Sequence, residues 1–226
     1  MSKQIRMDHI SADTLKFLKE LKKNNNRDWF QKHKKRYELA QAGLIDFVDQ
    51  LTPALAKFDK NLIGIEPKKT VFRIYRDVRF SKNKQPYKLN MGAHIQGGTK
   101  MEPKAGYYIH LEPGNCFLAG GAYNPPAAWL KAIRSEIDYN AEDLKKVLRA
   151  KSFKTYFGQL QGDKLKTSPR DYTADHPEIE FLRMKSFLAV HDLTDSLVTG
   201  KGFLSHCKKV FKALYPLDAY LNMALD

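Results

Sequence analysis

Hydrophobic residues near the N-terminus recur at helical spacing. Leucines fall at every third position between Ser11 and Asn24, which predicts a short helix that Ser11 caps and a run of asparagines from Asn24 ends. A longer helix is expected to begin with Asp28 as its cap, and its apolar positions continue until Pro53 kinks or interrupts it. The N-terminal quarter of the chain is therefore predicted to be helical.

The hydrophobic period falls to two after Pro67. Apolar and polar residues alternate over residues 70–80 and again over residues 89–95, as they do in a strand with one buried face. Two further strands are expected at residues 107–111 and 116–122, with a hairpin connection between them. Because short loops join consecutive strands, we expect an antiparallel sheet of about four strands in the middle of the chain.

The remainder of the chain is expected to be mainly helical. The elements predicted there are a helix opened by Pro125 and Pro126, helical segments at residues 141–148 and near Phe153, a loop over residues 162–177, a short strand at residues 185–191, a helix at residues 202–214 and a last helix from Pro216. No repeat, low-complexity tract or Gly/Ser-rich linker divides the sequence. The pattern predicts a single α+β domain over residues 1–226, with N-terminal and C-terminal helices packed on the sheet.

Composition places the chain among globular proteins. Of its 226 residues, 42% are hydrophobic and 12% aromatic, which argues against intrinsic disorder. Its two cysteines, Cys116 and Cys207, are too few for a disulfide framework or a four-cysteine zinc site. The first residues lack the apolar segment of a secretory signal, and no apolar run approaches the roughly 20 residues of a membrane span. We therefore expect a soluble cytoplasmic protein with no membrane partner.

The net charge of +14 is concentrated in two segments. Residues 68–88 contain eight cations and one acid, Asp77, and therefore carry +7, half of the total. Residues 16–38 contain nine cations and three acids, but their lysine-rich helical pattern is typical of a solvated helix face. The arginine-rich segment is therefore the stronger indication of function.

The expected strand at residues 71–80 has two different faces. One face is apolar except for Arg76, whose guanidinium needs either a carboxylate strut or a ligand if it is carried inward. The other face carries Arg73, Asp77 and Arg79, so that one carboxylate is shared by two guanidiniums. Arginines oriented by a carboxylate in this way can bind a planar anion through paired hydrogen bonds.

The loop after the expected strand adds hydroxyl and ammonium groups to these arginines. The candidate substrate-binding residues are Arg73, Arg76, Arg79, Ser81, Lys84, Lys88 and, from the helix after Pro126, Arg134. Asp77 is expected to orient the arginines or to act as a general base, and Tyr87 to donate a proton. Together these residues predict a site for a small phosphorylated or carboxylated anion, and whether a reaction is catalysed there stays open.

Two other functions fit the same residues. Nucleic acid is a possible partner, because the basic segment and the lysine-rich helix could bind phosphates while tyrosines stack on bases. Alternatively, the arginines and Asp77 could form a structural network in a noncatalytic interaction domain. A pocket requires cations that converge on one place. Nucleic-acid binding requires an exposed strip of positive charge. A structural network requires guanidiniums whose hydrogen bonds are made within the protein. The sequence does not indicate the oligomeric state.

No metal and no cofactor are expected. His94, His110 and Glu112 are predicted on the outward faces of their strands, but a third metal ligand is not evident. The sequence contains no phosphate-binding loop, and its glycine pairs lack the strand–turn–helix context of dinucleotide folds. Gly120 and Gly121 are more typical of a bulge or of a close backbone approach.

One block of the sequence is distinctive: FRIYRDVRFS at residues 72–81, followed by KQPYK at residues 84–88. Further characteristic segments are NNRDWF at residues 25–30 and the surroundings of Gly106, Gly120, Arg134 and His176. With these blocks the chain resembles an uncharacterised family of bacterial and fungal conserved hypothetical proteins, a domain of unknown function. The resemblance implies one full-length domain, and it implies no activity, substrate or cofactor.

Overall fold

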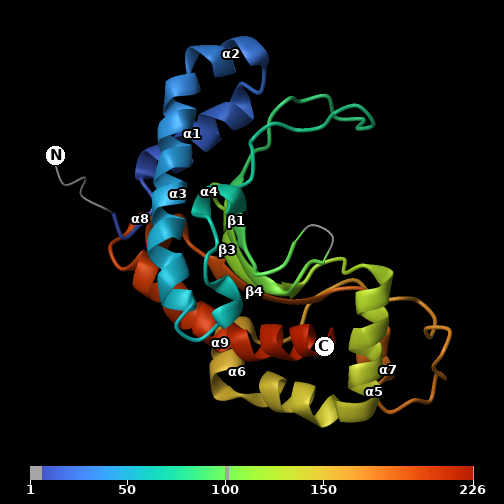
Figure 1. The fold of residues 1–226 in the computed structure, drawn as a ribbon. Coiled ribbons are helices and arrows are strands. Elements are labelled where there is room, and N and C mark those ends of the chain that lie inside the picture. The colour runs from blue at the N-terminus through green and yellow to red at the C-terminus, as the bar shows by residue number, and fades with distance from the viewer. Residues whose placement is uncertain (1–6, 100–101, 226) are drawn as a thin grey trace. The chain divides into compact units, whose positions relative to one another are not determined.

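The computed structural model describes residues 7–99 and 102–225. Within this described part, one four-stranded antiparallel sheet has the order β1 (Met91–Ile95), β2 (Gly106–Leu111), β3 (Cys116–Ala122) and β4 (Phe187–Leu193). Helices precede and follow these strands along the chain (Figure 1). The expected α+β fold is therefore confirmed. β1 to β3 lie where the sequence predicts strands, and β4 begins two residues later than expected.

Contacts group the chain into two compact units. The first unit comprises the described residues of Met1–Ile95, Tyr108–Leu118 and Asp192–Lys209. The second unit comprises the described residues of Gln96–Tyr107, Ala119–His191 and Val210–Asp226. A single domain over residues 1–226 stays a prediction.

The first unit is mainly helical at its N-terminal end. Its helices are α1 (Ala12–Lys23), α2 (Arg27–Lys32), α3 (Lys34–Leu55), a 3₁₀ turn η1 (Lys60–Leu62), α4 (Pro67–Thr70) and α8 (Asp195–Thr199). Ser11 caps α1 as expected, because its hydroxyl accepts a hydrogen bond of 3.3 Å from the Asp13 backbone N–H. Phe17, Leu18 and Leu21 of α1 are fully buried, so this helix contributes its apolar face to the core of the unit.

The expectation of one long helix beginning at Asp28 is wrong. The side chain of Asn26 accepts a hydrogen bond of 3.0 Å from the Trp29 backbone N–H and so starts α2 two residues earlier. His33 then separates α2 from α3. Pro53 does not interrupt α3 but lies in its last turn, two residues before the helix ends at Leu55.

Residues 71–80 do not form the predicted strand, so the assignment of their side chains to two faces is wrong. They make only isolated bridges, Val71 with Ala93 and Tyr75 with Tyr87. Residues 81–90 return alongside them, and we call residues 71–90 the arm. Figure 1 shows the arm, in teal and green, reaching away from α1, α2 and α3. A regular ladder does not form partly because Pro86 has no N–H to donate.

The second unit contains the later helices. They are α5 (Ala127–Arg149), α6 (Lys151–Phe157), α7 (Ile179–Leu182) and the C-terminal part of α9 (Phe203–Met223), which begins in the first unit. Pro126 precedes α5 as expected, and the two helical segments predicted on either side of Asn140 are one helix with a kink at that residue. Residues 162–177 contain no helix or strand, as expected. Pro216 does not start a new helix but lies inside α9.

Candidate functional site

Arg76 holds the two sides of the arm together. Its Nη1 donates a hydrogen bond of 3.0 Å to the Gln85 carbonyl, and its Nη2 donates one of 3.3 Å to the Ser81 hydroxyl. The Arg76 backbone N–H also donates to the Pro86 carbonyl at 2.9 Å. The guanidinium is thus bound to a carbonyl and a hydroxyl, and its contacts are not those of a buried strut to a carboxylate.

Asp77 and Arg79 form a bidentate pair on the exposed arm. Arg79 Nε donates to Asp77 Oδ1 at 3.0 Å, and Arg79 Nη2 donates to Oδ2 at 2.7 Å. The hydrogen bonds from Arg79 lower the pKa of Asp77, and the charge of Arg73 lowers it further. Both carboxylate oxygens therefore already accept hydrogen bonds from Arg79, which leaves Asp77 poorly placed to remove a proton from a substrate.

Lys84 also binds the arm itself, since its Nζ donates to the Val78 carbonyl at 3.1 Å. Arg73 and Lys82 are exposed, and their side chains have no hydrogen bond or ion pair with any residue of the described ranges. Lys88 is half-buried, with its Nζ 5.2 Å from the centre of the Phe72 ring. Burial, followed by the nearby charge of Arg73, lowers the pKa of Lys88. Within the described residues, none of these three cations has an ion-pair partner.

Tyr87 is only 3% exposed and does not face solvent as a proton donor would. Its ring stacks on Phe30 of α2, with the ring centres 3.9 Å apart. Asn25 binds its backbone from both sides, donating to the Tyr87 carbonyl at 3.0 Å and accepting from the Tyr87 N–H at 3.2 Å. Tyr87 is therefore the residue that anchors the arm to the helices of the first unit.

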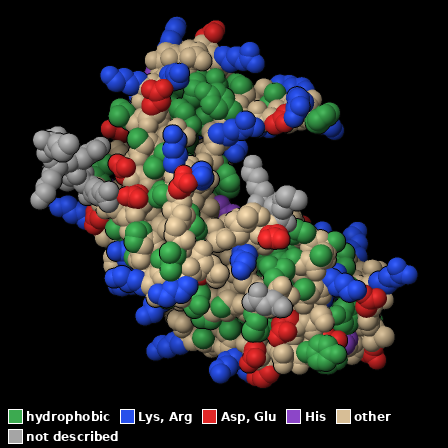
Figure 2. All heavy atoms as spheres, viewed as in Figure 1, with side chains coloured by type: hydrophobic (Ala, Val, Ile, Leu, Met, Phe, Trp, Pro, Cys, Tyr) green, Lys and Arg blue, Asp and Glu red, His purple; other side chains and the backbone are tan. Residues whose placement is uncertain are grey.

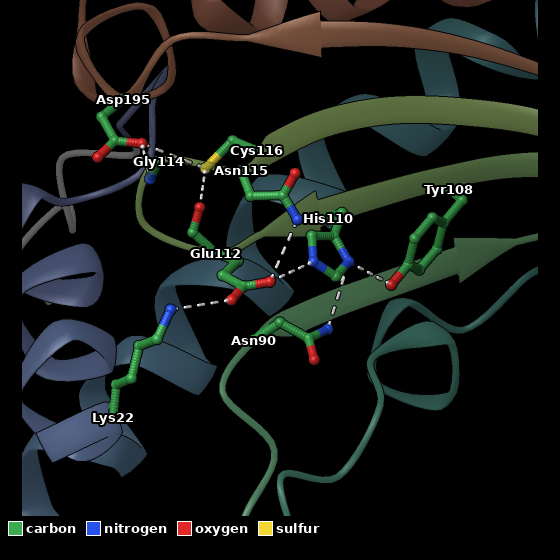
Figure 3. A network of polar contacts seen from close by, with 9 residues as sticks. All are labelled: Lys22, Asn90, Tyr108, His110, Glu112, Gly114, Asn115, Cys116 and Asp195. Atoms are coloured by element: carbon green, nitrogen blue, oxygen red, sulfur yellow. Dashed lines mark hydrogen bonds and ion pairs between the residues drawn. The ribbon is translucent and has the colours of Figure 1, made fainter.

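A second polar cluster in the first unit surrounds His110 of β2 (Figure 3). Tyr108 lies on one side of the imidazole, and its hydroxyl donates to His110 Nδ1 at 2.8 Å. Glu112 lies on the other side, with its Oε2 3.5 Å from His110 Nε2. Burial raises the pKa of Tyr108 to about 12, so the hydroxyl keeps its proton. Since Tyr108 and Asn90 both donate toward Nδ1, the geometry assigns the imidazole proton to Nε2.

The same cluster continues to Cys116 and Asp195. Cys116 Sγ donates to the Glu112 carbonyl at 3.2 Å and lies 3.7 Å from Asp195 Oδ1, which also accepts from the Gly114 N–H at 2.9 Å. Burial raises the pKa of the Cys116 thiol to about 11, so this cysteine is not an activated nucleophile. In the described residues, no three His, Cys, Asp or Glu side chains are arranged to hold a metal.

Sequence reasoning singled out His110 and Glu112, and it named Tyr108 only as a ring that could stack on bases. It did not connect Tyr108 with His110, and it missed Asn90 and Asp195. The alternation of β2 places residues 108 and 110 on one face, and this signal could have identified Tyr108. Nothing in the sequence pattern indicates Asn90 or Asp195, because loops bring them to the cluster.

We expect the His110 cluster to make stability depend on pH. Burial lowers the pKa of His110, and also that of His94 on β1, below the ordinary histidine value of 6.5. The unfolded chain therefore binds more protons than the folded protein below about pH 6.5. The free energy of unfolding should be highest above that pH and fall as the pH is lowered through the folded pKa values.

Thermal unfolding between pH 7.5 and pH 5 checks this expectation. This window lies above the ordinary pKa of an aspartate, and the hydrogen bonds from Arg79 lower the pKa of Asp77 further. The midpoint should fall in the wild type, and it should fall less in His110→Gln and least in the double variant with His94→Gln. Equal slopes in all three proteins would contradict the assignment.

Arg134 belongs to α5 in the second unit, apart from the other predicted site residues. Its Nε donates to the Leu182 carbonyl at 2.8 Å, and its Nη2 donates to the Met184 carbonyl at 3.3 Å. Both partners belong to the second unit. We therefore treat Arg134 and the arm as separate candidate sites.

The fold and the arm define the class of protein to which the chain belongs: an α+β protein whose most basic segment is an exposed arm before the sheet. The chain belongs to the conserved hypothetical protein family DUF2461, whose model matches residues 13–220. This confirms the resemblance seen in the sequence. No curated protein and no solved structure matches the chain. Within the described residues, every helix is too short or too polar to cross a membrane.

Proposed function

We propose that this protein binds single-stranded nucleic acid through the arm. The observation that carries the proposal is Phe80, which is 96% exposed at the outer end of the arm. An exposed aromatic ring has an unfavourable contact with water, and it offers a surface on which a base can stack. The Arg79 guanidinium lies 5.9 Å from the centre of the Phe80 ring, so a cation stands beside this surface.

The distribution of the remaining cations supports a long polyanion. Arg73 and Lys88 lie close together at the base of the arm, and Lys82 lies near its outer end, so the three cations are found at both ends of the arm. Figure 2 shows Lys and Arg side chains along the arm and a hydrophobic surface at its end. A phosphate backbone presents charges at regular intervals and therefore suits such a surface better than a single small anion does.

Exposed aromatic rings accompany the cations. Phe72 is 44% exposed and Tyr75 is 43% exposed. Both belong, like Arg73, to residues 71–80, the first half of the arm. Cations that contact phosphates and rings that stack on bases are the two elements of sequence-tolerant binding to single strands. The small-anion site predicted for the arm is less well supported, because Arg76, Arg79 and Lys84 are bound within the arm.

Fluorescence anisotropy with a labelled oligothymidine tests the proposal. Wild type should bind with an affinity that falls steeply as salt rises. Each of Arg73→Ala, Lys82→Ala and Lys88→Ala should reduce the slope of log affinity against log salt by about 0.7, the value for one phosphate contact to a single strand. Phe80→Ala should weaken binding about tenfold, with the salt slope unchanged, because stacking on one base contributes about 1–3 kcal/mol.

Lys57→Ala is the matched control, since Lys57 is an exposed cation of the first unit outside the arm. It should bind the oligonucleotide like wild type. A duplex of the same length should compete poorly. Wild-type affinity in Phe80→Ala and in the three arm variants would refute the proposal.

A further inference from the structure

The second unit contains a cavity of about 420 Å³ beside α5. Its polar lining consists of Lys131, Arg134, Ser135, Arg170, Asp171 and Tyr172. The first three residues belong to α5, and the last three belong to the loop over residues 162–177. The cavity thus has three cations and one carboxylate on its wall.

Arg134 is held in this wall by one edge of its guanidinium. Nε and Nη2 form that edge, and they donate to the carbonyls of Leu182 and Met184. The opposite edge, formed by Nη1 and the second hydrogen of Nη2, has no acceptor in the described parts of the chain, and no carboxylate pairs with Arg134 there. A half-buried guanidinium without a counter-ion favours the binding of an anion. Its two parallel N–H groups can donate to two oxygens of the same anion.

The loop side of the cavity is fixed by its own contacts. Pro169 is buried, and its carbonyl accepts a hydrogen bond of 3.1 Å from the Tyr172 N–H. The Tyr172 ring meets the ring of His176 edge to face, with centres 5.7 Å apart. His176 Nε2 in turn lies 3.0 Å from Asp138 Oδ1 of α5. The contact between His176 and Asp138 therefore joins the loop to α5, the helix that carries Arg134, so the two walls of the cavity are in contact with each other.

Tyr172 and Ser135 add neutral donors to the three cations. Burial, followed by the charges of Asp138 and Asp171, raises the pKa of Tyr172, so its hydroxyl keeps the proton it can donate. Arg170 and Lys131 are exposed, and neither has an ion pair in the described chain. The lining residues carry a net charge of +2, from three cations and one carboxylate, and this charge balances that of a phosphate monoester dianion.

We propose that this cavity is a binding site for the phosphate group of a small phosphomonoester, held by Arg134, Arg170 and Lys131. The site is independent of nucleic-acid binding by the arm, because all its residues belong to the second unit. Arg134 was predicted to bind a small anion, and the proposal keeps that role but assigns it to this cavity, which the sequence did not indicate.

Thermal unfolding and titration calorimetry of the full chain with inorganic phosphate test the site. At a phosphate concentration ten times the dissociation constant, the midpoint should rise by about 3–6 °C. Potassium chloride at the same ionic strength should give no such rise. Arg170→Ala and Lys131→Ala should each weaken phosphate binding about tenfold and leave the midpoint without phosphate unchanged, because neither side chain is bound within the described chain.

Two variants separate this site from general effects of charge. Lys154→Ala removes an exposed cation of α6 in the same unit and should bind phosphate like wild type. Arg73→Ala removes a cation of the arm and should also bind phosphate normally, while it weakens oligonucleotide binding. Loss of the phosphate response in Arg73→Ala would place the anion on the arm and overturn the proposal.

The choice of anion is tested by a comparison of phosphate, phenyl phosphate and succinate. Phosphate and phenyl phosphate should both bind, and both should lose affinity in Arg170→Ala. Binding of succinate in place of phosphate would assign a carboxylate ligand and overturn the phosphate assignment. Unchanged phosphate affinity in Arg170→Ala and Lys131→Ala would overturn the site itself.

Discussion

Replacement of Tyr87 by alanine should lower the free energy of unfolding by about 3–5 kcal/mol, as expected for removal of a buried aromatic ring. The ring stacks on Phe30 at 3.9 Å and is 3% exposed, so its loss leaves a cavity at the base of the arm. Phenylalanine at the same position should cost less than about 1 kcal/mol, because within the described residues the hydroxyl makes no hydrogen bond.

Urea unfolding of the three proteins measures this difference. Tyr75→Ala is the matched control, because this neighbouring tyrosine is 43% exposed and should cost much less than Tyr87→Ala. If Phe and Ala at position 87 were equally harmful, the hydroxyl would be the important group and the role as an anchor would be wrong. The Ala variant should also bind oligothymidine more weakly, because its arm has lost the stacking of residue 87 on Phe30 of α2.

Gly121→Ala should destabilise the protein by about 2–5 kcal/mol, the sum of left-handed backbone strain and overpacking against a fixed neighbour. Gly121 has a φ of 108°, and a Cβ at this residue would lie 1.9 Å from the carbonyl oxygen of Phe187 on β4. That oxygen is a backbone atom of the adjacent strand, so it cannot move aside as a flexible side chain would. The close approach expected at the glycine pair is thus the pairing of β3 with β4.

Gly64→Ala provides the comparison for Gly121→Ala. Gly64 also has a positive φ, 81°, but a Cβ there meets no atom within 4 Å, so its replacement should cost only the backbone strain of about 1–2 kcal/mol. Chemical denaturation of both variants separates the two contributions. Equal losses of stability would show that the contact with Phe187 does not matter.

Local signals were sufficient for most helices and strands. The Ser11 cap, the helix after Pro126 and the strand at residues 116–122 follow from side chains and periodicity within a few residues. Errors arose where a local signal has two outcomes. Pro216 can begin a helix or be accommodated inside one, and in the structure it lies inside α9. The C-terminal part of α9 is joined to α5 by the hydrogen bond of 2.9 Å from Trp129 Nε1 to the Leu221 carbonyl.

The arm shows the limit of periodicity most clearly. Alternation over residues 70–80 indicates two environments for the side chains, but it does not say whether another strand pairs with the segment. In the structure the segment pairs only at isolated bridges, and Phe80, which alternation places on the apolar face of the expected strand together with Arg76, is almost fully exposed. Tyr87, in contrast, is buried, and its backbone is bound by Asn25, which lies 62 residues earlier in the chain.

By itself, the sequence determined the α+β class, the family and the concentration of charge on residues 68–88, because periodicity, motif and composition are properties of neighbouring residues. The pairing of Arg79 with Asp77 is also local, since the two residues are two positions apart. Only the tertiary structure decided the surroundings of Arg134, which is bound by carbonyls 48 and 50 residues away and lines a cavity with Arg170. Long-range contacts bring these groups to Arg134, and no local pattern of residues encodes them.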